Sequence, residues 1–275
     1  MRTPADAADA VIHTLGIRSP EDLRQLDVIA WQRGAMVRFE PLRGAEARVT
    51  VLGGRSVITI SSTITDPRRR RFSMAHELGH HELHRETAPR LTVCHADDLD
   101  HWRDAHQSGR TLEQEANEFA ASLLLPTRLF GPACQTANPS LDLVAQLSNQ
   151  FDVSLTATAL RFAEFCPESI AVVFIQDHRV KWWRGSQEFR DSGLYVATKS
   201  RVSSHTRAGA CYQSGLTRPS HGPVLAGEWI ETRTLEDRAQ IREFALPMAT
   251  QRAVLSLLWV DRDILRDEDD DWIDD

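Results

Sequence analysis

The chain has 275 residues, 41% of them hydrophobic and 26% charged, which is enough for one large or two ordinary folded domains. No apolar run approaches the roughly 18 residues of a membrane span, and the N-terminus lacks the basic and then apolar pattern of a signal peptide, so we expect no membrane partner. The formal net charge is −7. Residues 267–275 hold seven acidic residues and no basic one, so the rest of the chain has 32 acidic and 32 basic residues. This balance excludes the excess of basic residues that is typical of a protein that binds nucleic acid directly.

Two helices are predicted ahead of a group of strands. Thr3-Pro4 and Ser19-Pro20 each combine an N-cap residue with proline at the first helical position, and apolar residues recur at helical spacing behind both. Gly16 and Gly34 stand where a C-terminal glycine would end each helix. Alternating Val and Ile residues and the turn signal Gly53-Gly54 then predict strands near 35–40, 47–52 and 56–61.

Four consecutive arginines, Arg68 to Arg71, precede the most informative segment. Positive charge at a helix N-terminus opposes the helix dipole. Two interpretations stay open: a solvated end of a loop, or contact with an acidic partner or substrate.

Residues 71–84 read RFSMAHELGHHELH and contain a His-Glu-x-x-His motif. Residues four apart lie on one face of an α-helix, about 6 Å apart, so His76 and His80 can bind one metal ion through imidazole nitrogens. Glu77 lies on the same turn and can act as general base toward water at the metal. His84 lies about 12 Å of helix rise from His76, so we expect it to support the site or the helix end instead of binding the metal. The alternative is a plain helix with two solvated histidines.

A third ligand is expected further along the chain. The metzincin pattern is excluded, because Leu83 and Glu86 stand where that class has glycine and histidine. Thr111 and Gln114 have capping-box spacing and predict a second helix, which Pro126 ends.

Glu113 and Asn117 share one face of this second helix, beside its apolar stripe. Glu113 can supply the third ligand, and Asn117 can hydrogen-bond a histidine that binds the metal. The alternative makes Glu113, Glu115 and Glu118 exposed acids that the helix dipole favours near an N-terminus.

The segments around the second helix are expected to support the site. Residues 85–110 are polar and read as a long loop bordering a cleft; a further metal site at His95, His101 and His106 is the less favoured interpretation. After a turn at Gly131-Pro132, residues 140–165 are predicted to be helical with a break near 152–154, and their apolar stripes favour packing support over reading DNA.

The pattern changes at Cys166-Pro167, so we place a domain boundary there. We expect residues 1–166 to form the first domain and residues 167–266 to form a smaller α+β domain. This second domain is expected to be sensor-like, and it contains no catalytic motif. Residues 267–275 are expected to be a disordered acidic tail. The second domain is predicted to contain a helix at 235–242 and strands near 170–175, 180–183, 193–198, 224–231, 243–248 and 254–260.

Cysteine usage indicates the compartment. The chain has no Cys-x-x-Cys pair, and its four cysteines are scattered: Cys94, Cys134, Cys166 and Cys211. We expect reduced thiols in a cytoplasmic protein.

The segment Phe-Ser-Met-Ala-His-Glu-Leu-Gly-His and the downstream Glu-x-x-Ala-Asn-x-Phe-Ala-Ala together resemble the ImmA/IrrE metallopeptidase family, over roughly residues 4–165. The resemblance implies an α+β, gluzincin-like fold in which His76, His80 and Glu113 bind Zn²⁺, or alternatively Mn²⁺, with Glu77 as base. It also implies the substrate, a helix-turn-helix transcriptional repressor whose cleavage derepresses stress, DNA-damage or mobile-element genes.

The resulting prediction is a zinc-dependent endopeptidase. A regulatory protein that holds a repressor or antitoxin without cutting it is the main alternative, and metal-dependent hydrolysis of a small substrate is another. Peptide hydrolysis also needs an oxyanion donor. Tyr195 and Tyr212 lie outside the motif region, so the donor is left open, with His205 as one candidate.

Overall fold

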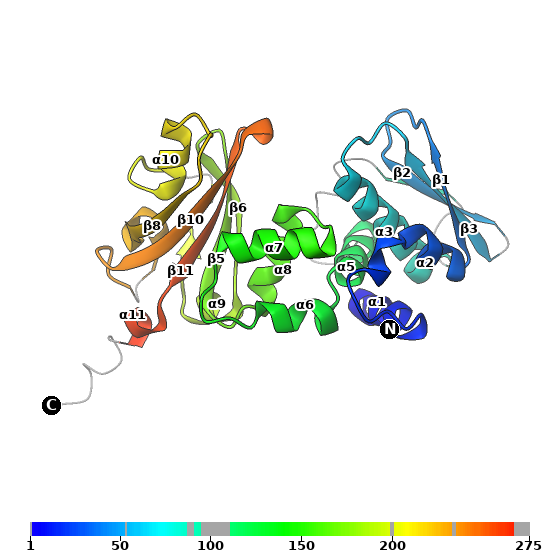
Figure 1. Ribbon diagram of the computed structural model, residues 1–275, viewed down its shortest axis with the longest axis horizontal. Helices are drawn as coiled ribbons and strands as arrows, with labels where there is room; N and C mark the ends of the chain where they lie inside the picture. The colour runs from blue at the N-terminus through cyan, green and yellow to red at the C-terminus, as the bar shows by residue number, and fades with distance from the viewer. Residues whose placement is uncertain are drawn as a thin grey trace. The chain divides into compact units, whose positions relative to one another are not determined.

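The structure is a computed structural model that describes residues 2–52, 54–86, 91–94, 111–198, 201–232 and 235–266. It divides into two units, and both contain helices and sheet, which confirms the α+β class (Figure 1). The first unit runs up to Pro132 and includes Ser148–Ser154, whereas the second contains Ala133–Leu147 and the chain from Leu155 onward. The boundary expected at residue 166 therefore falls inside the second unit. The predicted acidic tail lies outside the described residues. Within those residues, no helix combines the length and apolar character that crossing a membrane requires.

The helices of the first unit start where their N-cap signals stand. Thr3 and Asp6 form a reciprocal capping box in which the Thr3 hydroxyl accepts from the Asp6 N–H at 3.1 Å. The second expected helix begins late, because the Asp22 carboxylate accepts from the N–H groups of Arg18 and Ser19 and holds a short 3-10 turn first. The helical elements are α1 (Pro4–Thr14), η1 (Asp22–Arg24), α2 (Leu26–Gln32), α3 (Pro67–His84), α5 (Leu112–Leu124) and α6 (Thr127–Cys134), the last continuing into the second unit.

The sheet of the first unit contains the three predicted strands and one that was not predicted. The strands lie in the order β1-β3-β2-β4, with β1 and β3 parallel and the other neighbours antiparallel. The loop expected over residues 85–110 is wrong at residues 91–94, where the β-prone run Leu-Thr-Val-Cys pairs with β2. His95, His101 and His106 lie outside the described residues. The strands are β1 (Ala35–Glu40), β2 (Ala47–Leu52), β3 (Arg55–Ser61) and β4 (Leu91–Cys94).

Close packing of α3 against α5 fixes the centre of the first unit. A glycine inside α3, Gly79, permits this contact: a Cβ there would lie 3.1 Å from the Ala116 Cα, the Ala116 carbonyl oxygen and the Phe119 ring. Phe119 is itself fully buried, together with Leu78 on α3. Two helices carrying polar site residues are therefore held in backbone contact by an apolar seam.

Gly79→Ala is expected to destabilise the protein. Alanine is favoured over glycine in a helix by about 1 kcal/mol, but overpacking a tight contact costs about 1–3 kcal/mol, and here two of the crowded atoms belong to the backbone. We therefore expect a net loss of about 1 kcal/mol in the free energy of unfolding, measured by urea denaturation. An increase in the free energy of unfolding would show that α3 and α5 can move apart enough to accommodate the added methyl group at little cost.

The second unit is built on an antiparallel sheet of five strands, in the order β6-β5-β11-β10-β8. Its central strands β5 and β11 are apolar runs buried on both faces. One face is covered by α9 and α10 through residues such as Phe189 and Cys211. The strands are β5 (Ser169–Gln176), β6 (Arg179–Gly185), β7 (Tyr195–Val196), β8 (Ser220–Leu225), β9 (Ile230–Glu231), β10 (Gln240–Met248) and β11 (Ala253–Val260), where β7 and β9 pair separately.

The helices of this unit partly follow the prediction. The break expected near 152–154 separates α7 from α8, as predicted. The turn expected at Gly131-Pro132 is wrong, because both residues lie in α6, where a proline near the end of a short helix removes few hydrogen bonds. The remaining helices are α7 (Leu141–Phe151), which ends in the first unit, α8 (Leu155–Phe165), α9 (Gln187–Asp191), α10 (Arg207–Gln213), η3 (Ala226–Glu228), η4 (Ala249–Gln251) and α11 (Arg262–Arg266).

The helix predicted at 235–242 is also wrong, because its last residues begin strand β10. Every second residue at the start of that strand is buried: Ile241, Glu243 and Ala245. Because one of these buried residues is a glutamate, the alternation of apolar and polar residues typical of a strand is hidden in the sequence. Glu243 is buried because its carboxylate accepts four hydrogen bonds. The donors are the Arg207 and Ala208 N–H groups, the Trp229 indole and the Ser256 hydroxyl, at 2.8–3.0 Å. The carboxylate thus fixes the start of α10 on the sheet.

Candidate metal centre

Helix α3 begins with an acidic cap and a proline. The Asp66 carboxylate accepts from the N–H groups of Arg68 and Arg69 at 2.9 and 3.4 Å, and Pro67 occupies the first turn. Each of the four arginines has a partner within the first unit. Their partners are Ser148 for Arg68, Glu46 for Arg69, the Ile64 carbonyl for Arg70 and Asp152 for Arg71.

One face of α3 is anchored to the strands and to α2. The His81 imidazole lies 2.8 Å from the Ser56 hydroxyl and 2.9 Å from the Arg33 carbonyl oxygen. Arg33 also forms a two-point ion pair with Glu82, at 2.7 and 2.9 Å. Burial lowers the pKa of His81, which favours the neutral ring in this position. These contacts set the rotation of the helix and so determine which residues its opposite face presents.

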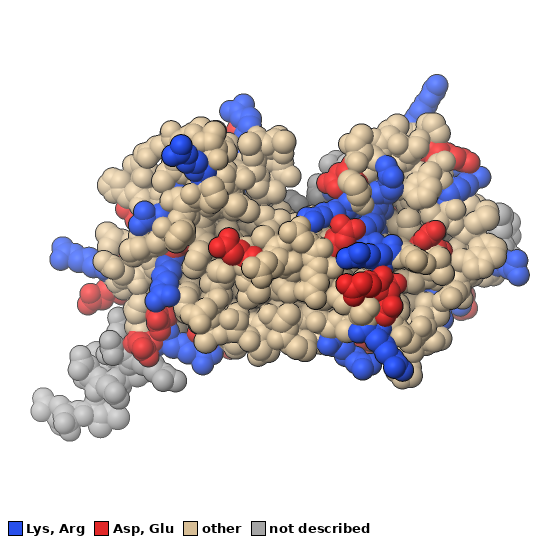
Figure 2. Space-filling model, in the orientation of Figure 1, with Lys and Arg blue, Asp and Glu red and all other residues tan. Residues whose placement is uncertain are grey.

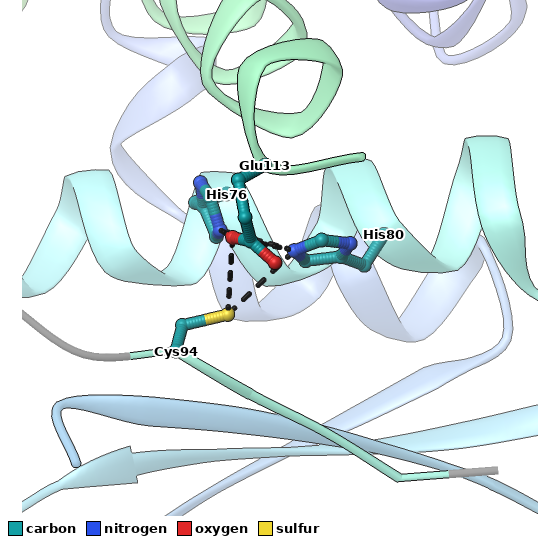
Figure 3. Close-up of side chains that lie close together, drawn as sticks. All are labelled: His76, His80, Cys94 and Glu113. Carbon is teal, nitrogen blue, oxygen red and sulfur yellow. Dashed lines mark hydrogen bonds and ion pairs between the residues drawn. The ribbon is translucent and has the colours of Figure 1, made fainter. Parts of the chain in front are cut away.

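That opposite face brings His76 and His80 together with Glu113 of α5. The His76 Nε2 lies 3.1 Å from the His80 Nε2 and 3.0 Å from the Glu113 Oε2. The His80 Nε2 lies 3.3 Å from the same carboxylate oxygen. Both histidines are buried and Glu113 is half-buried (Figure 3). Burial alone would raise the pKa of Glu113, but the two imidazoles beside its carboxylate outweigh burial and hold that pKa far below the usual carboxyl range.

Asn117 orients the first imidazole. Its Oδ1 lies 2.8 Å from the His76 Nδ1, and an amide oxygen can only accept a hydrogen bond. The proton therefore sits on Nδ1, and the lone pair of Nε2 faces Glu113. Asn117 lies four residues after Glu113 on α5, so one helix face supplies both groups.

His84 orients the second imidazole through a relay that ends at Glu115. Its Nε2 lies 2.9 Å from the Glu115 Oε2 and its Nδ1 lies 3.0 Å from the His80 Nδ1. Burial lowers the pKa of His84, so a neutral ring donates to the carboxylate and accepts from His80. The lone pair of the His80 Nε2 is then directed into the cluster. The sequence did not reveal that Glu115 takes part.

These residues fit a divalent metal ion by the chemistry of their donors. Two imidazole lone pairs and a carboxylate oxygen within 3.3 Å of one another repel unless a proton or a cation lies among them. Ligand atoms about 2.0–2.1 Å from one tetrahedral Zn²⁺ are about 3.3–3.4 Å apart, close to the observed separations. The three groups predicted as ligands thus form a candidate metal site.

Cys94 joins this cluster and was missed by sequence reasoning. Its Sγ lies 3.6 Å from the His80 Nε2 and 3.7 Å from the Glu113 Oε2, and the four ligand atoms all lie within 4.8 Å of one another. Figure 3 shows the thiol reaching the two helices from the strand side. Only the pairing of β4 with β2 brings it there, and the single available signal was the β-prone run that Cys94 ends.

The remaining candidate residues are Glu77 in the first unit and three residues in the second unit. Glu77 is fully buried on α3 directly after His76. His205, Tyr195 and Tyr212 all belong to the second unit, and His205 is 81% exposed beside Glu228.

Asn117→Ala is expected to weaken metal affinity without abolishing it. Losing the partner that fixes an imidazole lowers affinity by about 10- to 100-fold. A competition titration with a chromogenic chelator measures the effect, and Glu118→Ala on the same helix is the matched control. If both variants bind metal as tightly as the native chain does, Asn117 does not orient His76.

Residues 30–163 match the sequence model of Peptidase_M78, the IrrE N-terminal-like domain. Among solved structures, a Mycobacterium tuberculosis transcriptional regulator is similar with a TM-score of 0.54 and 15% identity, over 93% of this chain and 87% of that one. At this identity the likeness shows the fold alone. No curated protein matches the sequence. The family match covers both helices of the cluster and confirms the predicted resemblance to the ImmA/IrrE family: residues 30–163 are an IrrE N-terminal-like domain.

Proposed function

We propose that the chain is a zinc-dependent endopeptidase, with His76, His80 and Glu113 as metal ligands and Glu77 as general base. The convergence of three donor atoms within 3.3 Å, on two helices locked by an apolar seam, carries this proposal. The same donors also suit Mn²⁺.

The chemistry divides between the metal and one carboxylate. Bound at this site, Zn²⁺ would polarise the scissile carbonyl and make water a stronger acid. Glu77 adjoins His76 in sequence and is buried on α3. As general base, its carboxylate would take a proton from water and deliver it to the leaving amine nitrogen. His84 and Asn117 hold the two imidazoles in the tautomers that this task needs.

The proposed substrate is a helix-turn-helix repressor whose cleavage derepresses stress, DNA-damage or mobile-element genes. The family resemblance supports this class of substrate. The charge distribution favours a protein over direct contact with nucleic acid, since acidic and basic side chains are interspersed on the face seen in Figure 2.

A regulatory protein that binds a repressor without cutting it is the second candidate. The position of Cys94 favours it, because a metal held by four protein side chains is typical of structural sites, whereas catalytic sites keep one position open.

Cleavage of purified proteins distinguishes the candidates. The zinc-loaded chain is incubated with any small helix-turn-helix repressor encoded beside its gene, with an unrelated folded repressor, with unfolded casein and with short peptides. We expect mass spectrometry to find one cut in one neighbouring repressor, within an exposed segment that can lie extended. A repressor that is retained on the immobilised chain but stays intact would support the binding protein instead. Hydrolysis of short peptides alone would support a small-substrate hydrolase.

Residues 168–275 are proposed to select the substrate or regulate cleavage. A fragment ending near residue 166 retains Ser148 and Asp152, which pair with the arginines at the start of α3. We expect it to bind metal but to cut the repressor slowly and with less choice of site. Equal rates and equal site choice in fragment and full chain would exclude this role, and a folded but metal-free fragment would show that the peptidase domain extends further.

A further inference from the structure

The candidate metal centre has a fourth donor whose position is set by the backbone. Cys94 ends β4, pairs with Ala47 of β2, and accepts a hydrogen bond on its carbonyl oxygen from the Glu46 N–H at 3.1 Å. Glu46 in turn forms an ion pair with Arg69 at the start of α3, at 2.8 Å. The strand that carries the thiol is thus tied to the helix that carries the two histidines. Cys94 is fully buried, so its side chain is held beside the cluster by packing as well as by the ladder.

The distances to the thiol suit metal binding better than a chance contact. With a Zn–S bond of about 2.3 Å and Zn–N or Zn–O bonds of about 2.0–2.1 Å, a tetrahedral site separates sulfur from its neighbours by about 3.5–3.6 Å. The observed separations are 3.6 Å to the His80 Nε2 and 3.7 Å to the Glu113 Oε2. The donor set of two imidazoles, one carboxylate and one thiolate is chemically suited to Zn²⁺.

We propose that the Cys94 thiolate is a fourth protein ligand that closes the metal centre in the resting protein. This inference rests on the metal site of the proposed function and concerns its regulation. A hydrolytic centre needs one position for water, and in the closed state Cys94 occupies it. Hydrolysis then requires the thiolate to dissociate from the metal. Cys94 therefore controls whether the metal centre is closed to water or open to it.

The position of β4 is compatible with such a passage. Among the described strands, β4 is an edge strand of four residues that pairs only with β2. A short edge strand is held by fewer backbone hydrogen bonds than an internal one, so its displacement costs less than moving α3 or α5. Movement of β4 would withdraw the thiol and leave His76, His80 and Glu113 in place.

Cobalt substitution tests the proposal on the full-length protein. Co²⁺ bound to a thiolate has an intense near-ultraviolet charge-transfer band, which nitrogen and oxygen ligands lack. We expect this band in the native chain and in Cys134→Ser, a buried cysteine of the second unit, and its loss in Cys94→Ser and Cys94→Ala. The Cys94 variants should still bind Co²⁺ through the other ligands, with affinity lowered by at least about 10-fold. A native complex without the band, or a band that survives in the Cys94 variants, overturns the proposal.

Two further measurements separate this inference from the proposed function. In the native chain, Zn²⁺ should protect Cys94 from alkylation by iodoacetamide, as located by peptide mapping; equal labelling with and without Zn²⁺ overturns the proposal without use of a variant. At saturating Zn²⁺, Cys94→Ala should cut the repressor faster than the native chain does. If Co²⁺ binds without the band and the repressor is still cut, only the role of Cys94 fails. If Co²⁺ does not bind to the native chain at all, the metal site itself fails.

Discussion

Glu77→Gln is expected to keep the metal and to lose at least about 100-fold of the rate of repressor cleavage. Glutamine has nearly the shape of glutamate but cannot take a proton from water, while His76, His80 and Glu113 remain in place. Glu77 is fully buried, so an isosteric change also avoids leaving a cavity in α3. The rate is measured by single-turnover cleavage, with metal content determined in the same sample.

Glu82→Gln is the matched control, since Glu82 lies on the same helix and glutamine can still accept a hydrogen bond from Arg33, which keeps α3 anchored. It should retain the native rate once metal is bound. If Glu77→Gln loses metal together with activity, Glu77 supports the site instead of acting as its base. If activity survives in Glu77→Gln, another group takes the proton.

Glu113→Ala is expected to lower metal affinity more strongly than any other single change on α5. The carboxylate supplies both a donor atom and the negative charge that offsets the cation, and its low pKa keeps it ionised at neutral pH. The expected loss exceeds the roughly 10- to 100-fold effect of a supporting residue such as Asn117. Chelator competition measures it.

The other acids of α5 make this prediction specific. Glu118→Ala should leave metal affinity unchanged. Glu115→Ala should weaken it moderately, because Glu115 holds His84, which orients His80. Equal effects at all three positions would mean that general negative charge, and not a specific ligand, determines metal affinity.

The part of the site that depends on helix geometry was predictable from the sequence. The four-residue spacing of His76 and His80 places them on one face of any regular helix. The capping box of Thr111 and Gln114 also fixed the start of α5, and the structure confirms both of its hydrogen bonds. Local spacing and local caps are sufficient for such features, because each depends on residues within a single turn.

Features that depend on distant pairing were not predictable. Cys94 reaches the cluster only because β4 aligns with β2 across an interval of more than 40 residues in the chain, and spacing alone does not specify this pairing. Glu243 led to a second error, the prediction of a helix at 235–242 where strand β10 begins. A buried carboxylate on an inward position of β10 conceals the alternation of apolar residues, so the segment resembled the polar face of a helix. In both cases the local structure depends on contacts between residues far apart in the chain: the pairing of β4 with β2, and the hydrogen bonds of Glu243.

The position of a bound Zn²⁺ ion shows directly whether His76, His80 and Glu113 are metal ligands. Crystals of the full-length protein grown with Zn²⁺ are measured on both sides of the zinc absorption edge, and an anomalous difference map locates the ion without reference to activity. We expect one strong peak about 2.0–2.1 Å from the Nε2 atoms of His76 and His80 and from a carboxylate oxygen of Glu113. A peak at other residues, or an empty cluster in crystals that hold Zn²⁺ elsewhere, would contradict it.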